Sequence, residues 1–117
     1  MSEKKDKTSK STRDIFDIHS TYCGLFSNPA RLRIVWILSE GAKTVGELAT
    51  KLDLPVSTVS GHLRKLRDKG VVESTRDGSN IIYNTTSDHF VNGCSIIRAG
   101  IMEIIERDGR YFEGMEK

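Results

Sequence analysis

Apolar residues return every three or four positions in five stretches of the chain, the spacing that is typical of amphipathic α-helices. We expect the first helix to begin at Ser11 or Thr12 as its N-cap, with Asp14 favourably placed in the first turn. The fifth begins at Ser87 or Asp88, and its apolar positions alternate spacings of four and three: Phe90, Cys94, Ile97, Ile101 and Ile104. Such an a/d seam is typical of a helix that packs against another helix.

The second stretch has its own start and stop signals. Asn28 is placed to cap it, and Pro29 at the first helical position gives up no hydrogen bond that the helix needs. Gly41 is expected to end it. Because this helix is apolar on most sides, it is predicted to lie at the centre of the core.

Two shorter helices follow in close succession. Thr44 and Glu47 form the T-x-x-E pattern of a capping box at the start of the third. Residues 53–55 break that helix, Ser57 is expected to cap the fourth, and Gly70 is expected to end it. The fourth helix turns three apolar residues toward the core: Val59, Leu63 and Leu66. Two capped helices joined by a short turn are the outline of a helix-turn-helix.

A β-hairpin is predicted directly after the fourth helix. Residues 71–84, VVESTRDGSNIIYN, contain two strand-like runs that Asp77 and Gly78 are expected to join. Three apolar side chains are expected to anchor the hairpin to the core: Val72, Ile82 and Tyr83. The expected fold is therefore mostly α with a small β-hairpin: a winged helix-turn-helix of five helices plus a wing.

Length and charge suggest the domain organisation. The 117 residues are expected to form one domain at 11–107, with a disordered basic arm at 1–10 and a C-terminal tail at 108–117. The net charge of +2 is small, but basic residues concentrate in the arm and in residues 57–78. No apolar run is long enough to span a bilayer and no signal-peptide core is present, so we expect a cytoplasmic protein without membrane partners.

The outer face of the predicted fourth helix carries the side chains that a DNA-reading helix needs. Small residues at its N-terminal end let the backbone enter the major groove, and longer donors reach base edges and phosphates. The candidates for DNA contact are Ser57, Thr58, Ser60, Gly61, His62, Arg64, Lys65 and Arg67 from the helix and Arg76 from the wing. Arg76 is placed either to touch a flanking minor groove or phosphate, or to face solvent as an ordinary hairpin residue. Singly, these residues suit any exposed helix, but two capped helices followed by a hairpin favour DNA binding.

Three segments together resemble the ArsR/SmtB family of winged-helix transcriptional repressors: LFSNPARLRIVWILSEG, TVGELATKLDLPVSTVSGHLRKLRDKGVV and SNIIYN. The resemblance extends from about Ile15 to Ile105, and the family's S-x-H-L pattern falls on Ser60, His62 and Leu63. It implies a repressor that binds double-stranded operator DNA as a homodimer and releases it when an inducer binds. It also implies dimerisation through the first and last helices, so that two recognition helices address two half-sites of a pseudo-palindrome.

The same resemblance indicates where an inducer site would lie. The family's zinc ligands would fall on Ser87, His89, Gly100 and Glu103. Two of these four residues are unable to bind zinc well, which leaves His89 and Glu103 as the remaining metal candidates. The cysteine pair of the family's arsenic and cadmium sensors would lie around Thr44 and Gly46, and neither is cysteine.

The two cysteines, Cys23 and Cys94, fall on the first and last predicted helices. Three roles remain open for them: inert packing, a thiol switch that responds to oxidants or reactive sulfur, or capture of arsenite or a soft metal with ligands from the partner chain. A covalent link between them would shift the first helix against the last. The expected inducer is an unidentified small molecule, and no cofactor is expected.

Other functional classes fit this sequence less well. It has no phosphate loop, no metal-hydrolase spacing and no nucleophile paired with a base, so we do not expect an enzyme. A winged-helix protein-interaction module is the alternative from another class. Such a module favours an acidic or apolar outer face on the fourth helix, whereas this face is basic and rich in hydroxyl groups.

Overall fold

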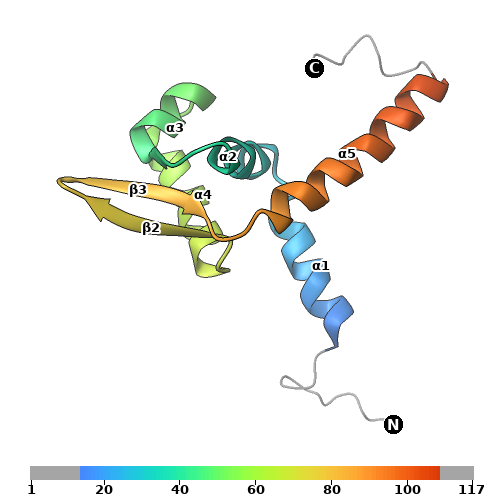
Figure 1. Cartoon of the computed structure of the whole chain (residues 1–117), viewed down its shortest axis with the longest axis horizontal. Coiled ribbons are helices and arrows are strands. Elements are labelled where there is room, and N and C mark those ends of the chain that lie inside the picture. The colour runs from blue at the N-terminus through green and yellow to red at the C-terminus, as the bar shows by residue number, and fades with distance from the viewer. Residues whose placement is uncertain (1–13, 109–117) are drawn as a thin grey trace.

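The computed structural model describes residues 14–108 of the chain. In that range it forms five helices and three strands in the order α1 (Ile15–Leu25), α2 (Pro29–Ser39), β1 (Lys43–Thr44), α3 (Val45–Leu52), α4 (Val56–Asp68), β2 (Val72–Asp77), β3 (Asn80–Thr85) and α5 (His89–Asp108). Figure 1 shows the predicted winged helix-turn-helix, with the β2–β3 hairpin and α5 extending from opposite sides of the body. The predicted basic arm, the tail beyond residue 108 and the candidate caps Ser11 and Thr12 lie outside the described residues.

The sheet contains one strand more than the sequence indicated. Its order is β1-β3-β2, and the two-residue strand β1 pairs antiparallel with β3 through Lys43 opposite Tyr83. In the hairpin, Asp77 pairs with Asn80, so the two-residue turn is Gly78-Ser79 and not the expected Asp77-Gly78. Gly78 has φ +67°, the positive φ that the first turn position of a type I′ or II′ hairpin requires and that glycine adopts without strain.

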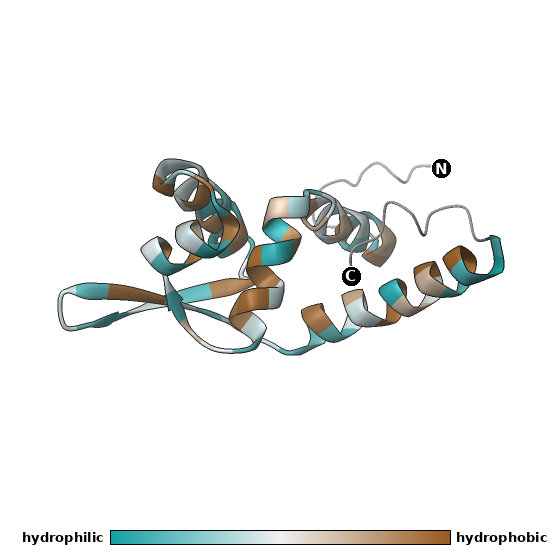
Figure 2. Cartoon of the chain, turned by 90° about the horizontal axis from the view of Figure 1, so that it is seen from above, coloured by the Kyte–Doolittle hydropathy of each residue, from teal (hydrophilic) through white to brown (hydrophobic). Residues whose placement is uncertain are grey.

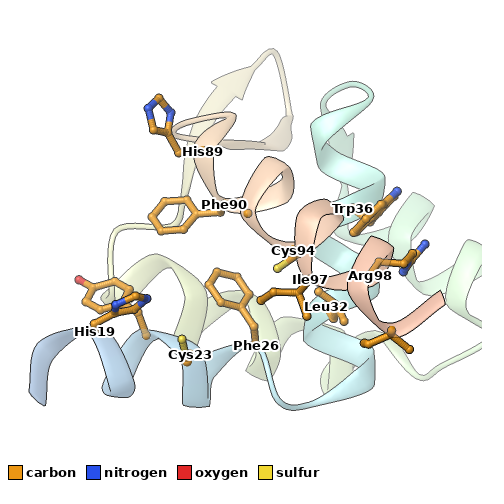
Figure 3. A pocket seen from close by; sticks show the side chains of 13 residues that line it. His19, Cys23, Phe26, Leu32, Trp36, His89, Phe90, Cys94, Ile97 and Arg98 are labelled. Atoms are coloured by element: carbon orange, nitrogen blue, oxygen red, sulfur yellow. The ribbon is translucent and has the colours of Figure 1, made fainter. Parts of the chain in front are cut away.

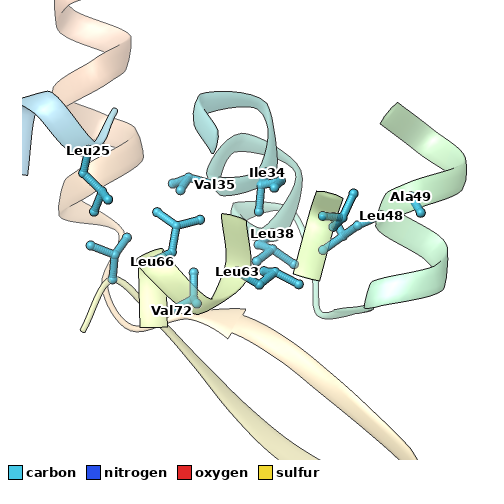
Figure 4. Close-up of a cluster of buried hydrophobic side chains, with 11 residues drawn as sticks. Leu25, Ile34, Val35, Leu38, Leu48, Ala49, Leu63, Leu66 and Val72 are labelled. Carbon is cyan, nitrogen blue, oxygen red and sulfur yellow. The ribbon is translucent and has the colours of Figure 1, made fainter. Parts of the chain in front are cut away.

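The hydrophobic core is centred on α2, as its apolar character predicted (Figure 4). Its buried members come from the four helices α1 to α4 and from the entry to the wing: Leu25, Ile34, Val35, Leu38, Leu48, Ala49, Val59, Leu63, Leu66, Val71 and Val72. Of the three predicted hairpin anchors, Val72 is buried, whereas Ile82 and Tyr83 are half-buried. The core therefore fixes the positions of α3, α4 and the base of the wing relative to one another.

Two helix starts differ from those expected. Asp14 is the N-cap of α1 rather than a first-turn residue, and its carboxylate accepts a hydrogen bond of 3.0 Å from the backbone N–H of Asp17. Ser57 does not cap α4, because Pro55 occupies the N-cap position and Val56 begins the helix. The Pro55 carbonyl already accepts the first helical hydrogen bonds, and so Ser57 lies within the first turn with its side chain exposed.

The predicted caps at the starts of α2 and α3 are confirmed. The Asn28 side chain caps α2, and Thr44 and Glu47 form a complete capping box on α3 with hydrogen bonds of 3.1 and 2.9 Å. The Ser87 hydroxyl accepts a hydrogen bond of 3.0 Å from the His89 backbone N–H at the start of α5. These local bonds satisfy backbone donors that have no partner within the helix.

The helices α1 and α5 extend away from the body (Figure 1), and residues coloured as hydrophobic recur along α5 (Figure 2). Both helices expose large apolar side chains. These are Ile15, Phe16 and Ile18 on α1 and Ile96, Ile97, Ile101 and Ile104 on α5. The two helices meet at an aromatic cluster in which Phe90 contacts Tyr22 and Phe26, with ring centroids 6.4 and 5.7 Å apart. Within residues 14–108, no helix has the length and apolar content needed to cross a membrane.

Candidate functional site

The helix α4 presents a polar face to solvent because its apolar stripe is fully used in the core. Val59, Leu63 and Leu66 are at most 1 % exposed and pack toward α2 and α3. Of the predicted DNA-contact residues on this helix, five are exposed and three are half-buried. The exposed ones are Ser57, Thr58, Arg64, Lys65 and Arg67, and the half-buried ones are Ser60, Gly61 and His62.

His62 lies at the edge of this polar face, where it is half-buried. Its Nδ1 atom is buried and has no hydrogen-bond partner among the described residues. Burial lowers the pKa of the His62 imidazole, and the positive charges of Arg31 and Lys65 lower it further. A neutral imidazole keeps one ring nitrogen as an acceptor, so His62 is less suited to phosphate contact than its cationic neighbours.

The wing continues the basic surface of α4. The Arg67 guanidinium lies 3.5 Å from the Ser74 hydroxyl on β2, a long contact that links α4 to the wing. Arg76 is exposed near the hairpin turn. Arg64, Lys65, Arg67 and Arg76 thus form one exposed set of cations on α4 and β2, which we call the basic face.

A second candidate site is a cavity of about 460 Å³ between α1, α2 and α5 (Figure 3). Its apolar wall includes four aromatic side chains, Tyr22, Phe26, Trp36 and Phe90. Sequence reasoning assigned no function to these four residues, because each fits the apolar pattern of its own helix. Only the packing of α5, which is distant in sequence, beside the consecutive helices α1 and α2 reveals that these rings face one space.

Both cysteines line this cavity from opposite walls (Figure 3). Cys23 on α1 is exposed, Cys94 on α5 is half-buried, and both are free thiols. Burial raises the pKa of the Cys94 thiol, and interaction with Cys23 raises it further, while Arg98 partly offsets both effects. The two thiols therefore line the same space.

The metal candidates gain little support from the geometry. His89 lies at the start of α5, where its Nδ1 atom is 3.1 Å from the Ser87 hydroxyl, and Glu103 is exposed further along the helix. Across residues 14–108, no three His, Cys, Asp or Glu side chains gather at one point that could hold a metal ion. A metal site would therefore need ligands from another chain.

Comparison with known proteins assigns the chain to a family. Residues 28–74 match the family model described as bacterial regulatory protein, arsR family. The crystal structure of NolR from Sinorhizobium fredii is 32% identical to the chain with a TM-score of 0.66, and the match covers 82% of this chain and 92% of that one. This chain belongs to the ArsR family. The resemblance read from the sequence and the predicted winged-helix fold are both confirmed.

Other ArsR relatives match over shorter segments. The HTH-type transcriptional regulator KmtR from Mycobacterium tuberculosis is 34% identical over 56% of this chain and 50% of that relative. The biofilm growth-associated repressor from Agrobacterium fabrum is 39% identical over 53% of this chain and 53% of that protein. The chain thus spans about half the length of these curated relatives. They are regulators and not enzymes, in agreement with the expectation from sequence.

Proposed function

We propose that this ArsR-family chain is a transcriptional repressor that binds double-stranded DNA. The observation that carries the proposal is the basic face, which combines exposed cations on α4 and β2 with small hydroxyl residues at the start of α4. A helix of this kind enters the major groove with its N-terminal end, while the wing lies along a flanking groove or the backbone. The acidic or apolar surface that a protein-docking module favours is absent from the described part of α4.

Removing charge from the basic face tests this proposal. We expect Arg64→Gln or Lys65→Gln to weaken binding to every DNA sequence, because a phosphate contact carries no base information. Each lost contact is expected to reduce the slope of log affinity against log salt concentration by about 0.9. Fluorescence anisotropy with specific and random duplexes at several salt concentrations measures both quantities.

The matched control for this test is Arg107→Gln. Arg107 is an exposed cation in the last turn of α5. The helix α5 extends from the body on the side opposite the wing (Figure 1). The control should leave affinity and slope unchanged. Unchanged values in the Arg64 and Lys65 variants as well would reject the assignment of α4 to phosphate contact.

We further propose that the repressor is a homodimer formed through α1 and α5 and addresses a pseudo-palindromic operator. Ile15 and Phe16 are 66% and 78% exposed, and Ile96 on α5 is 75% exposed. Large apolar side chains exposed on both helices indicate an interface, and α5 has only one buried residue, Ile105, among its twenty. A twofold axis through these helices gives the two α4 helices equivalent positions on two half-sites.

Placing a charge in this interface should dissociate the dimer. We expect Ile96→Glu to raise the dimer dissociation constant by at least about tenfold, because burying an unpaired carboxylate costs several kcal/mol. Sedimentation equilibrium measures the constant. Ile81→Glu is the control, since Ile81 is also an exposed isoleucine, 43%, but lies on the wing. Equal dissociation of both variants, or a monomeric parent protein, would contradict the proposed interface.

For regulation, we propose that oxidation of Cys23 and Cys94 releases the DNA. Both thiols open into the cavity that separates α1 from α5. A peroxide oxidises one thiol to a sulfenic acid with release of water, and the second thiol displaces a further water to form the disulfide. The bond would draw α5 toward α1 beside the Phe90 cluster and so change the separation of the two α4 helices.

A further inference from the structure

The cavity between α1, α2 and α5 has the construction of a small-molecule site. Its volume of 460 Å³ lies within the range of about 300–1,000 Å³ that is usual for ligand pockets. Such pockets combine apolar and aromatic walls with a few polar groups that orient the ligand. This cavity has aromatic rings from α1, α2 and α5, and its polar groups are cationic or neutral. No aspartate or glutamate of the described chain lines it.

The positive charge at the cavity is held in a fixed place. The Arg98 guanidinium carbon lies 4.0 Å from the centroid of the Trp36 ring, in the geometry of a cation–π contact (Figure 3). Arg98 lies at the edge of the cavity, where it also lines a neighbouring hollow beside Trp36 and Leu32. The planar fork of an arginine can pair with the two oxygens of a carboxylate. His19 and His89 also belong to the lining.

We propose that this cavity binds a small aromatic carboxylate. The planar ring of the ligand packs among Phe26, Phe90 and Trp36, and its carboxylate pairs with Arg98. No acidic side chain among the described lining residues neutralises Arg98, so a bound carboxylate would do so. An uncharged ligand of the same shape should bind more weakly because it lacks the ion pair with Arg98. A small inorganic anion should also bind more weakly because it lacks the aromatic contacts.

The competing occupant is a helix from a second copy of the chain. The cavity overlaps the helix-packing seam of α5, because four of the five seam residues line it: Phe90, Cys94, Ile97 and Ile101. Ile15 and Phe16 on α1 and Ile96 and Ile104 on α5 are exposed without lining it. These outer residues offer a partner a surface beside the cavity, and the titration described below distinguishes a cavity open to a ligand from one that a partner helix fills.

An occupied cavity would hold α1 and α5 apart at the proposed dimer interface. The ligand would then bias the separation of the two α4 helices, and this regulatory consequence rests on the proposed function. Binding of the ligand does not rest on the proposed function, since it depends on the cavity alone. The same cavity would also bring a bound molecule against Cys23 and Cys94, so ligand and thiol chemistry would act on one element.

Isothermal titration of the full-length protein with naphthoate tests the proposal without DNA. We expect saturable binding at one site per chain, weakened about tenfold or more in Arg98→Gln and unchanged in Arg107→Gln. Naphthamide, the uncharged analogue, is expected to bind about as weakly as naphthoate binds the Arg98 variant. No saturable binding to the folded parent protein would overturn the proposal, and this is also the outcome if a partner helix fills the cavity. Equal affinity for naphthamide, or full affinity in Arg98→Gln, would overturn the assignment to an anion.

A second variant tests the location independently of charge. Gly93 lines the cavity, and a β-carbon built on it meets no atom within 4 Å. Gly93→Leu should therefore fill the space without disturbing the helix, and naphthoate binding should be lost while the circular dichroism spectrum is retained. Retained binding would place the ligand elsewhere. If the parent protein binds naphthoate but no DNA, the proposed function fails and the ligand site stands.

Discussion

Leu63→Ala is expected to destabilise the protein by about 2–5 kcal/mol, the usual cost of emptying a fully buried leucine site. Leu63 is 1% exposed and lies on the core side of the helix whose opposite side forms the basic face. Because small domains are stable by only about 5–15 kcal/mol, this loss is a large part of the total. The midpoint of urea unfolding, compared at one protein concentration since the proposed dimer would contribute, measures the change.

The control for this substitution lies on the same helix. Val56 is 50% exposed at the start of α4, so Val56→Ala removes two methyl groups without emptying a core site and should change stability by about 0.5 kcal/mol or less. If both variants unfold at the parent midpoint, the assignment of Leu63 to the core is wrong. If Leu63→Ala unfolds early and binds DNA weakly, the recognition helix depends on this core for its position.

The helix starts and the apolar stripe of α4 could be predicted from sequence because their causes are local. The Thr44–Glu47 capping box needs only two side chains three residues apart, and Asn28-Pro29 needs only neighbours. The start of α4 was misplaced at Ser57 because two cap signals compete within three residues. In the structure Pro55 is the N-cap, because its fixed φ places its carbonyl where it accepts the first hydrogen bonds of the helix.

Features that depend on long-range packing could not be read from the sequence. The hairpin turn moved to Gly78-Ser79 because the register is set by strand pairing, and β1 exists only through its pairing with β3. His62 looked like a DNA-facing donor, but its burial depends on how α4 packs. The cavity forms only where α1, α2 and α5 meet. The sequence placed Cys23 and Cys94 on the first and last helices but did not indicate a cavity between them.

The two cysteines differ in ways that assign them different steps in the proposed thiol switch. Cys23 is exposed, whereas Cys94 is half-buried and its pKa is raised by burial. A raised pKa means that less thiolate is present at neutral pH, so Cys94 is the poorer first nucleophile. We therefore expect Cys23 to react first with peroxide and Cys94 to resolve the sulfenic acid. The rate of the second step should rise with pH, because the Cys94 thiolate fraction grows as pH approaches the raised pKa.

Single substitutions should separate these two steps and abolish the response to oxidant. Peroxide is expected to release DNA from the parent protein, with an intact mass lower by two hydrogen atoms, and from neither Cys23→Ser nor Cys94→Ser. Cys94→Ser should still form a sulfenic acid at Cys23 that dimedone traps, whereas Cys23→Ser should form much less adduct. Gel electrophoresis without reductant shows whether the disulfide lies within one chain or joins two. DNA release that persists in both variants would leave the cysteines as packing residues, and the cavity ligand would then be the remaining route to induction.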